Sequence, residues 1–582
     1  MRISTWIERK PKIKPRSTDS LTERILKIRG ISEDNMDDFI APASDLENDW
    51  KDIRNMKTAV NIFNEIVKTN GNVVISGDPD ADGVTSLAIL FNYFTKNLLP
   101  INVDYIYGQR DNGHGISEQI EQSKILFETE PELYNFNSCN LEKIANSDLL
   151  IIVDSSSNDI DGVKRVLDIK PDLKVIILDH HEFIDLETEK SMDDMNNTTI
   201  VNIQHSKDNS INKSLSGAGL AYKFIKGLDE TLDLKIEYQS SYFLDLVAVG
   251  MIGDMMRVDV YENRYLISQG LQNVNNVGLS RILKGAKVNL YTYNTKDIGF
   301  SVAPLINGSA RMGQIELAIQ ILICDTDKEA KPLRLKMDKL NKERQSIQKE
   351  LAEKFESQIN LDNKVLILVD SDSNKSFNGL VAQTIAQKYQ RPCFVVRDYN
   401  GMCMGSGRSY GGINTKQYLE ELDYVKAVGH NQSHGIEFPS NKLNELQDYV
   451  NRVFETKLKK DNVFYYDIEL DIDDEMWYNI NEIEKLNYIT GSGFPEITVL
   501  VSNAMVSDKS VIGKTQETVK ITVDDELVLI KFKVNEDWCS DVELFDTVSA
   551  IGTPLINVFY NFGTKETTKT PQVIIQDIAK GS

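Results

Sequence analysis

The stretch GDPDADG, at residues 77–83, follows a short apolar run and decides the fold of the first half of the chain. The same arrangement recurs in IIVDSSS (151–157) and IILDHHE (176–182). Short runs of Val, Ile and Leu without polar alternation predict buried parallel strands. Polar residues at the carboxyl ends of such strands meet in one crevice of a doubly wound sheet. We therefore expect seven side chains to converge: Asp78, Asp80, Asp82, Asp154, Asp179, His180 and His181.

The chemistry of this group predicts a site for divalent cations. Carboxylate oxygens with one or two imidazoles suit a pair of cations such as Mn²⁺ or Mg²⁺, and the group contains no thiolate of the kind that zinc sites use. Asp80 and Asp82 lie in a loop directly before a helix, and Asp154 could bridge the two cations. His180 would ligate through a ring nitrogen, whereas Asp179 is better placed to orient an imidazole.

One more carboxylate is needed to close the ligand set. Asp254 is the candidate, because it follows the apolar helix DLVAVGMIG (245–253). A lone Asp at a helix end is also explained by a cap or an ion pair, and the residues alone leave this question open.

Composition restricts the class of protein. A chain of 582 residues is too long for one core, so three or four domains are expected. The 65 basic and 88 acidic residues give a net charge of −23, which is unfavourable for nonspecific nucleic-acid binding, although a local groove can still be positive. Five scattered cysteines argue against a disulfide framework and favour a reducing cytoplasm. We expect no secretory signal and no membrane-spanning helix.

The pattern of elements predicts two α/β lobes joined by a long helix and followed by a small β-barrel. A β-sandwich without a ligand is the alternative for the last part. The predicted boundaries are an N-terminal basic arm and lead-in at 1–57, the first lobe at 58–325, the connecting helix at 326–360, the second lobe at 361–458 and an OB-like barrel at 459–582. The basic arm could contact phosphate, but a disordered tail is the simpler expectation.

The motifs GDPDADG, VDSSS and LDHHE, together with the Asp254 segment, resemble the DHH phosphoesterase superfamily. GSGRS and GHNQSHG in the second lobe, which we expect to be glycine-bearing loops, look like its DHHA1 companion domain. The order of further segments is similar to RecJ-type single-strand DNA exonucleases, and the resemblance covers about residues 60–582. These segments are GQRDNGHGIS (108–117), LSGAGLAYKF (215–224), ENRYLISQGL (262–271), PLINGSARMG (304–313) and LNKERQ (340–345).

The resemblance implies roles for individual residues. The metal ligands would be Asp80, Asp82, Asp154, His180 and Asp254, with Asp78 as a further acid nearby. His181 would face the scissile phosphate. The residues that would bind nucleotide phosphates are Arg110, Arg311, Ser406, Arg408, Gly429 and His430, with Ser406 and Arg408 at the 5′ end. The chain departs from the family pattern at His114, Ser155, Ser156, Arg257 and Val428, none of which is an expected metal ligand.

The resemblance implies an enzyme that degrades single-stranded DNA from its 5′ end to mononucleotides with two divalent cations, Mn²⁺ preferred or Mg²⁺. A single-strand-binding protein or a helicase would be a possible partner, and the protein would be monomeric and cytoplasmic. Two alternatives stay open: a DHH-type phosphodiesterase for short RNA or small nucleotides, and a non-catalytic replication scaffold. An inorganic pyrophosphatase is a remoter alternative.

Overall fold

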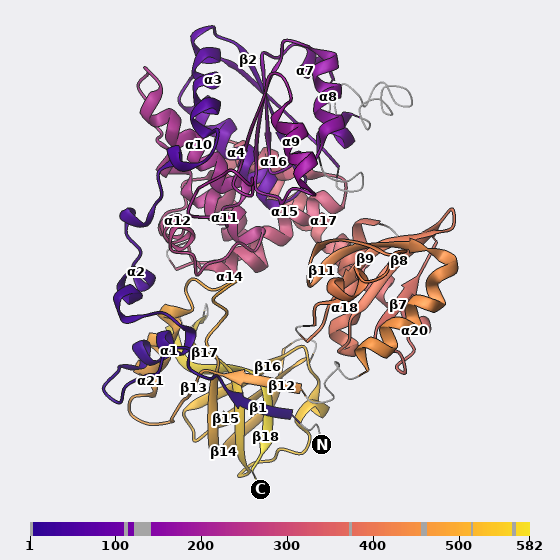
Figure 1. The fold of residues 1–582 in the computed structure, drawn as a ribbon. Helices are drawn as coiled ribbons and strands as arrows, with labels where there is room; N and C mark the ends of the chain where they lie inside the picture. The colour runs from indigo at the N-terminus through magenta and orange to yellow at the C-terminus, as the bar shows by residue number, and fades with distance from the viewer. Residues whose placement is uncertain are drawn as a thin grey trace.

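The computed structural model has two α/β lobes and a β-barrel domain (Figure 1). We call residues 56–323 the first lobe, 366–454 the second lobe and 462–580 the C-terminal domain. The residues that the structure describes are 4–109, 115–120, 141–290, 292–371, 375–411, 413–455, 462–513, 516–561 and 566–581. Among these residues, no helix combines the length and the apolar character that crossing a membrane requires.

A five-stranded parallel sheet forms the centre of the first lobe, in the order β3-β2-β4-β5-β6. Alternate residues of its strands enter two cores, with Ile151 on one face and Ile152 on the other, so both faces are covered by helices. The doubly wound prediction is therefore confirmed. The strands are β2 (Asn72–Gly77), β3 (Asn102–Tyr107), β4 (Leu149–Val153), β5 (Lys174–Asp179) and β6 (Thr198–Asn202).

Helices α3, α4 and α10 cover one face of this sheet, and α7, α8 and α9 cover the other. The chain moves from β2 outward to β3 and then returns to place β4 on the other side of β2. This reversal creates a switch point between β2 and β4, where ligands bind in open α/β sheets. The helices are α3 (Met56–Lys68), α4 (Ala81–Lys96), α7 (Leu141–Ala145), α8 (Ile160–Ile169), α9 (Leu186–Asp193) and α10 (Gly217–Thr231).

The rest of the first lobe is helical and leads into the connecting helix α17 (Asp327–Lys354). Thr326 and Glu329 form a capping box that starts α17, and a 3₁₀ turn at Phe355–Gln358 follows it. Ile347 and Leu351 of α17 and Phe355 of the following turn pack against the core of the second lobe. The preceding helices are α11 (Leu244–Gly253), α12 (Tyr261–Gln272), α13 (Val277–Gly285), α14 (Thr295–Asp297), α15 (Ala303–Arg311) and α16 (Ile315–Ile323), with a π-helical turn, η6 (Ile298–Val302), between α14 and α15.

The second lobe has a mixed sheet in the order β10-β11-β9-β8-β7. Its two glycine-bearing motifs, expected to be loops, instead lie largely in strands, because glycine here allows close packing between strands. A Cβ on Gly405 would lie 2.0 Å from the Val395 carbonyl oxygen. The elements are β7 (Leu366–Val369), α18 (Lys375–Tyr389), β8 (Cys393–Tyr399), β9 (Met402–Arg408), α19 (Thr415–Leu419), β10 (Lys426–His430), β11 (Ser433–Pro439) and α20 (Leu443–Phe454).

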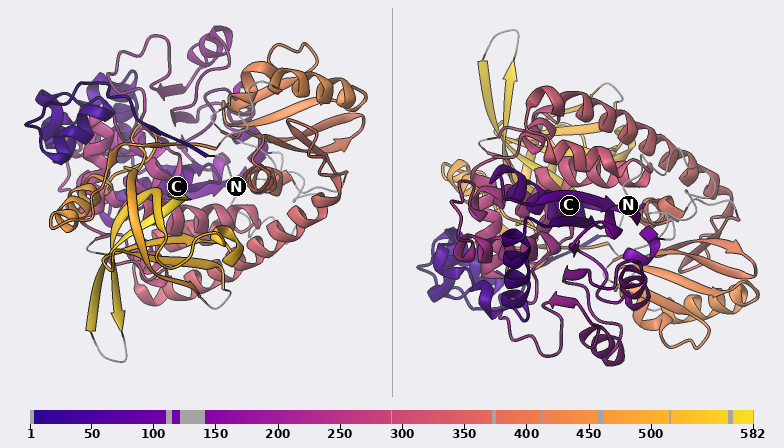
Figure 2. Two further views of the ribbon diagram at one scale, coloured as in Figure 1. Left: turned by 90° about the horizontal axis from the view of Figure 1, so that it is seen from below. Right: turned by 90° about the horizontal axis from the view of Figure 1, so that it is seen from above.

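The C-terminal domain confirms the predicted OB-like barrel. Its sheet order is β13-β14-β15-β16-β18-β17, and a further pairing of β14 with β17 closes the barrel. Strands β17 and β18 continue beyond the barrel as a projecting hairpin (Figure 2). The elements are β12 (Asn462–Tyr466), β13 (Ile468–Glu469), α21 (Met476–Leu486), β14 (Val499–Ile512), β15 (Thr518–Val523), β16 (Leu527–Phe532), β17 (Thr547–Asn561) and β18 (Glu566–Lys580).

The N-terminal arm differs from the expected disordered tail. Residues Ser4–Glu8 form β1, which pairs in parallel with β12, and α1 (Leu21–Arg29) and α2 (Met36–Ile40) follow (Figure 1). The Arg29 guanidinium donates to both oxygens of the buried Asp467 carboxylate at 2.6 and 2.8 Å. Arg9 lies 3.2 Å from the same carboxylate. These basic residues thus hold the arm to the C-terminal domain.

We predict that Asp467→Ala loosens this attachment. Removing one partner of a buried ion pair leaves a charge uncompensated and costs about 3–5 kcal/mol. The thermal transition of the C-terminal domain should therefore fall, and limited proteolysis should release the N-terminal arm. Glu65→Ala is the matched control, because Glu65 pairs with Lys68 at the exposed surface. Equal protease resistance of the two variants would contradict the role of Asp467.

Candidate metal centre

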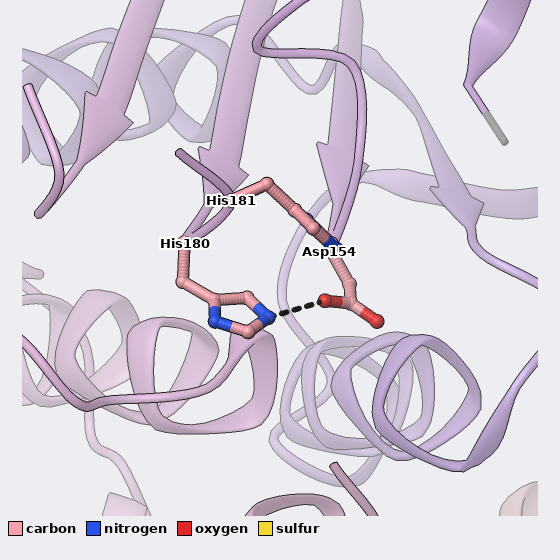
Figure 3. Close-up of side chains that lie close together, drawn as sticks. All are labelled: Asp154, His180 and His181. Atoms are coloured by element: carbon pink, nitrogen blue, oxygen red, sulfur yellow. Dashed lines mark hydrogen bonds and ion pairs between the residues drawn. The ribbon is translucent and has the colours of Figure 1, made fainter. Parts of the chain in front are cut away.

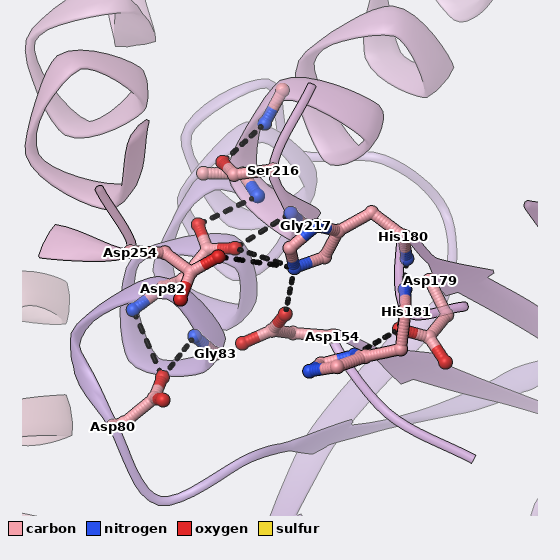
Figure 4. Close-up of polar contacts among 12 residues, drawn as sticks. Asp80, Asp82, Gly83, Asp154, Asp179, His180, His181, Ser216, Gly217 and Asp254 are labelled. Carbon is pink, nitrogen blue, oxygen red and sulfur yellow. Dashed lines mark hydrogen bonds and ion pairs between the residues drawn. The ribbon is translucent and has the colours of Figure 1, made fainter. Parts of the chain in front are cut away.

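The carboxyl ends of β2, β4 and β5 bring the predicted acids and histidines together (Figure 4). Asp154 directly follows β4, and Asp179 ends β5. Asp254 reaches the same place from the C-terminal end of α11. Three overlapping groups of side chains place one possible ligand atom from each member within 4.8 Å of one another. They are Asp78–Asp80–Asp154, Asp82–His180–Asp254 and Asp154–His180–His181.

Asp80 both caps a helix and takes part in this cluster. Its Oδ1 accepts hydrogen bonds from the backbone N–H groups of Asp82 and Gly83, each at 3.1 Å, and so starts α4. Gly83 is required here, because a Cβ at this position would lie 2.4 Å from the Asp78 carbonyl oxygen. The tight turn places the three acids of the first motif at the switch point of the sheet.

Asp82 is buried and lies at the N-terminus of α10. Its Oδ2 accepts from the Gly217 N–H at 2.6 Å and its Oδ1 from the Ala218 N–H at 3.0 Å. The positive end of the helix dipole stabilises the carboxylate charge. Sequence reasoning missed this support, although Ser216 before an apolar helical stretch is an N-cap signal that could have located it.

The His180 imidazole is the meeting point of three carboxylates. Its Nε2 lies 3.1 Å from Asp154 Oδ1, 3.4 Å from Asp254 Oδ2 and 3.7 Å from Asp82 Oδ2 (Figures 3 and 4). Asp154 is therefore in contact with His180 and also belongs to the group with Asp78 and Asp80. A residue that joins both groups of acids has the position that a bridging ligand requires.

The backbone at Asp154 is held in an unusual conformation. Its φ is 61°, in the left-handed region that non-glycine residues rarely adopt. Gly217 packs directly against this residue, since a Cβ there would lie 2.7 Å from the Asp154 Cβ. Gly250 of α11 packs in the same way against Asp82, since a Cβ at this position would lie 2.4 Å from Asp82 Oδ1. The two glycines leave room for the carboxylates between α10 and α11.

Asp179 and His181 form a separate pair beside the cluster. The two side chains lie 2.7 Å apart, between Asp179 Oδ1 and His181 Nδ1. Burial alone would raise the pKa of Asp179, but the adjacent His181 and the Ser157 N–H, among other contacts, lower it below its usual value. The Asp179 charge in turn raises the pKa of His181 to about 10. His181 is half-exposed, and the contact with Asp179 uses its Nδ1 and leaves Nε2 available for another partner.

The acids of the cluster repel one another. Burial and the neighbouring carboxylates of Asp82 and Asp80 raise the pKa of Asp154 well above its usual value, and the same causes raise the pKa of Asp254 to about 8. Burial also raises the pKa of Asp82. Several carboxylates around one largely buried imidazole are the donor set of hard divalent cations, so these residues fit Mn²⁺ or Mg²⁺.

The residues expected to bind phosphate lie mostly in the second lobe. Ser406 and Arg408 are in β9, and Gly429 and His430 are in β10, where Gly429 has φ 116°. Arg311 ends α15 and donates to the Ser376 carbonyl oxygen in the first turn of α18. Arg110 lies outside the described residues.

Arg311 and Arg408 approach the same helix from different lobes. A Cβ on Gly379 of α18 would lie 2.4 Å from Arg408 Nη2, and Ser376 is one turn earlier. The first turn of α18 carries backbone N–H groups and the positive end of a helix dipole. Two guanidinium groups and a helix N-terminus together can bind an anion.

Two further histidines have structural partners. His434 is buried against Phe394 and lies 2.9 Å from the Thr415 hydroxyl, and burial lowers its pKa to about 4. His205 is buried with its Nε2 3.1 Å from Asp193. Of the family departures, Val428 is 60% exposed and Arg257 is paired with Asp259, while His114 lies outside the described residues.

Comparisons with known proteins agree with this architecture. Residues 72–251 match the model of the DHH family, N-terminal domain, and residues 466–577 match that of the RecJ OB domain. The chain is therefore similar to DHH-family proteins over most of its first lobe and to the RecJ OB domain over its C-terminal domain. The long helix α17 and the second lobe lie between the two matched regions.

Two curated relatives are similar over most of the chain. The single-stranded-DNA-specific exonuclease RecJ of Bacillus subtilis is 26% identical over 91% of this chain, which spans 64% of the length of that RecJ. A putative SPbeta prophage-derived single-strand DNA-specific exonuclease, YorK, of the same organism is 24% identical over 95% of each chain.

The fold also matches a solved structure. RecJ from Thermus thermophilus in complex with Mn²⁺ superposes with a TM-score of 0.76, covering 99% of this chain and 80% of that one at 20% identity. The same protein has also been solved with Mg²⁺. These are the two cations that the donor set of the candidate centre suits.

We predict that Mn²⁺ raises the melting temperature of the first lobe, because a cation that binds only the folded chain stabilises it. Cation at 100 times its dissociation constant contributes about 2.7 kcal/mol per site. Differential scanning calorimetry with and without Mn²⁺ measures the shift. Asp154→Asn should lose most of it, whereas Asp168→Asn, which changes an exposed acid on α8, should keep it. A shift of equal size in both variants would place the cation elsewhere.

Proposed function

We propose that this protein is an exonuclease that degrades single-stranded DNA from the 5′ end to mononucleotides by two-metal phosphodiester hydrolysis. The observation that carries the proposal is the cluster of five carboxylates and His180 at the end of the first-lobe sheet, with the cationic first turn of α18 in the adjoining second lobe. RecJ-named relatives with this order of domains support it.

In this proposal, Asp80, Asp82, Asp154, His180 and Asp254 hold the cations, with Asp78 contributing to the group around Asp80 and Asp154. Two bound divalent cations would neutralise the charge of the phosphodiester and lower the pKa of a reacting water. Asp154, which contacts both groups of acids, would fix the separation of the two cations.

His181 would act on the scissile phosphate directly. Asp179 orients its ring through Nδ1 and keeps it protonated, so that Nε2 can donate a hydrogen bond to a phosphoryl oxygen. A fixed donor at this place stabilises the negative charge that develops there during displacement. Asp179 is accordingly a positioning residue and His181 a catalytic one.

The 5′ end would be held by Ser406, Arg408 and Arg311 at the first turn of α18, with Gly429, His430 and Arg110 contributing to the remaining phosphate contacts. A guanidinium group can bind a phosphate through two parallel hydrogen bonds. This geometry suits recognition of a terminal phosphate. Recognition of one end would give the enzyme its polarity.

A digestion of end-labelled single-stranded DNA, RNA and blunt duplex DNA, each with Mn²⁺ or Mg²⁺, tests the function. We expect 5′-phosphorylated single-stranded DNA to shorten to mononucleotides and the duplex to persist. Preferential loss of short RNA would favour the phosphodiesterase alternative. Stable full-length substrate under every condition would favour a non-catalytic scaffold.

Asp154→Ala should abolish turnover, with a loss of at least about 1,000-fold, because metal-ion charge stabilisation contributes several kcal/mol. Binding of single-stranded DNA should largely survive, since the phosphate-binding arginines are unchanged. Rates from single-turnover digestion and dissociation constants from fluorescence anisotropy separate the two effects. Near-normal turnover of this variant would exclude the bridging role.

Arg408→Ala should reduce kcat/KM about 10- to 100-fold on 5′-phosphorylated strands, the value of a lost charge-assisted hydrogen bond. The loss on 5′-hydroxyl strands should be much smaller. Arg452→Ala is the matched control, because Arg452 lies exposed on α20 of the same lobe. If Arg408→Ala harmed both substrates equally, Arg408 would not recognise the terminal phosphate.

A further inference from the structure

A cavity of about 640 Å³ lies between the helical part of the first lobe and the C-terminal domain. Met255, Lys296, Gly299 and Phe300 line it from the first lobe, and Tyr465 of β12 lines it from the C-terminal domain, with Arg9 of the arm beside them. Its size is within the range of about 300–1,000 Å³ that holds small organic ligands.

Two large apolar side chains are exposed in this cavity. Phe300 is 82% exposed and Met255 is 75% exposed, although the neighbouring Ile298 and Val302 are fully buried. Phe300 is carried by the π-helical turn η6, and Met255 has a left-handed backbone with φ 57°. Such turns and strained residues are concentrated at functional sites. Phe300 and Met255 thus line the cavity from backbone conformations that are less favourable than a regular helix.

The cavity begins next to the metal centre. Met255 directly follows Asp254, whose Oδ2 lies 3.4 Å from His180 Nε2. If its 5′ end is held at α18, as in the proposed function, a strand that passes the cluster would continue toward this cavity and the C-terminal domain. The cavity is therefore placed for the nucleotide on the 3′ side of the reacting phosphate.

The side of the cavity formed by Phe300 and Met255 favours a base over a phosphate as its occupant. Arg9 is paired with Asp467 and lies over the Tyr465 ring, with its Cζ 5.6 Å from the ring centroid. Lys296 is paired with Glu496, which also lines the cavity. Glu496 neutralises Lys296, whereas Arg9 shares the single charge of Asp467 with Arg29. The part of the surface that Phe300 and Met255 contribute is uncharged, with an aromatic ring and a thioether. Aromatic side chains stack on nucleobases of any sequence.

We propose that Phe300 and Met255 form a stacking platform for the nucleobase that follows the scissile phosphodiester on its 3′ side. The assignment rests on the proposed function, because it takes the direction of the strand from the 5′-end pocket. It adds a base-recognition subsite to a site whose other proposed contacts are to phosphate.

Equilibrium binding of a 5′-phosphorylated single strand tests the platform in the Asp154→Ala background, in which the strand stays intact. Phe300→Ala should weaken binding about 5- to 100-fold, the range for one lost base–aromatic stack. Phe300→Trp should restore it. The dependence of affinity on salt concentration should be unchanged, because loss of a phosphate contact would reduce the slope by about one, whereas loss of a stack does not.

Two further variants keep the test specific. Gly299→Leu should also weaken binding, because a Cβ there meets no atom within 4 Å and the added side chain would occupy the cavity. Leu98→Ala should have no effect, since Leu98 is 86% exposed just beyond the opposite end of α4 from the Asp80 cap. A strand with 5-iodouracil after the scissile position should crosslink to the segment carrying Phe300.

Unchanged affinity in Phe300→Ala, or a reduced salt slope, would overturn the platform. Crosslinking that avoids residues 295–302 would do the same. These results are separable from failure of the proposed function: Phe300-dependent binding by a protein that never cleaves DNA would support the platform and reject the exonuclease.

Discussion

Electrostatic repulsion among buried carboxylates is the constraint on which the first lobe depends. Asp82, Asp154 and Asp254 all lie within 4 Å of one imidazole nitrogen, and burial together with neighbouring carboxylates, Asp80 among them, raises the pKa of each. Such a cluster lowers the stability of a chain unless cations or fixed dipoles compensate it. Part of the compensation is built in, because the N-terminus of α10 binds both oxygens of Asp82. Divalent cations are suited to compensate the remaining negative charge of the carboxylates.

The residues proposed to bind phosphate lie apart from this cluster, mostly on the second lobe. The net charge of −23 would repel a nucleic acid, and the acidic centre would repel it most. Arg311 of the first lobe adds positive charge at this place. It contacts the first turn of α18, and Arg408 contacts the same helix. A local cationic site at the junction of two lobes can therefore hold a phosphate that the protein as a whole does not attract.

Much of this arrangement could be predicted from sequence, because strand periodicity carries it. Apolar runs followed by Asp or His predicted the sheet, its carboxyl edge and the converging acids. Asp254 could not be assigned in this way, since a helix-end carboxylate has several ordinary explanations and only α11 packing brings it to His180. The glycines at 405 and 407 indicated loops, yet they lie in β9, where the absence of Cβ atoms allows close contact with Val395 and His434. Sequence alone cannot distinguish a glycine that is needed for a turn from a glycine that is needed for close packing between strands.

The basic N-terminal arm was the other feature that local sequence could not explain, because its partner Asp467 is more than 400 residues away. Arg29 and Arg9 meet at Asp467, and Arg264 of α12 lies between Phe39 of the arm segment and Phe494 of the C-terminal domain, 3.7 and 5.5 Å from the two ring centroids. Burial lowers the pKa of Arg264 to about 9, so this contact is made against a desolvation cost. These charged groups join the arm, the first lobe and the C-terminal domain, and all three parts contribute residues that line the cavity next to Asp254. In the proposed function, a strand held at α18 would have to meet the metal centre and the barrel in one register, and a rigid junction would provide this. The arm is therefore part of the junction between the first lobe and the C-terminal domain. Its arginines pair with Asp467 of the protein itself.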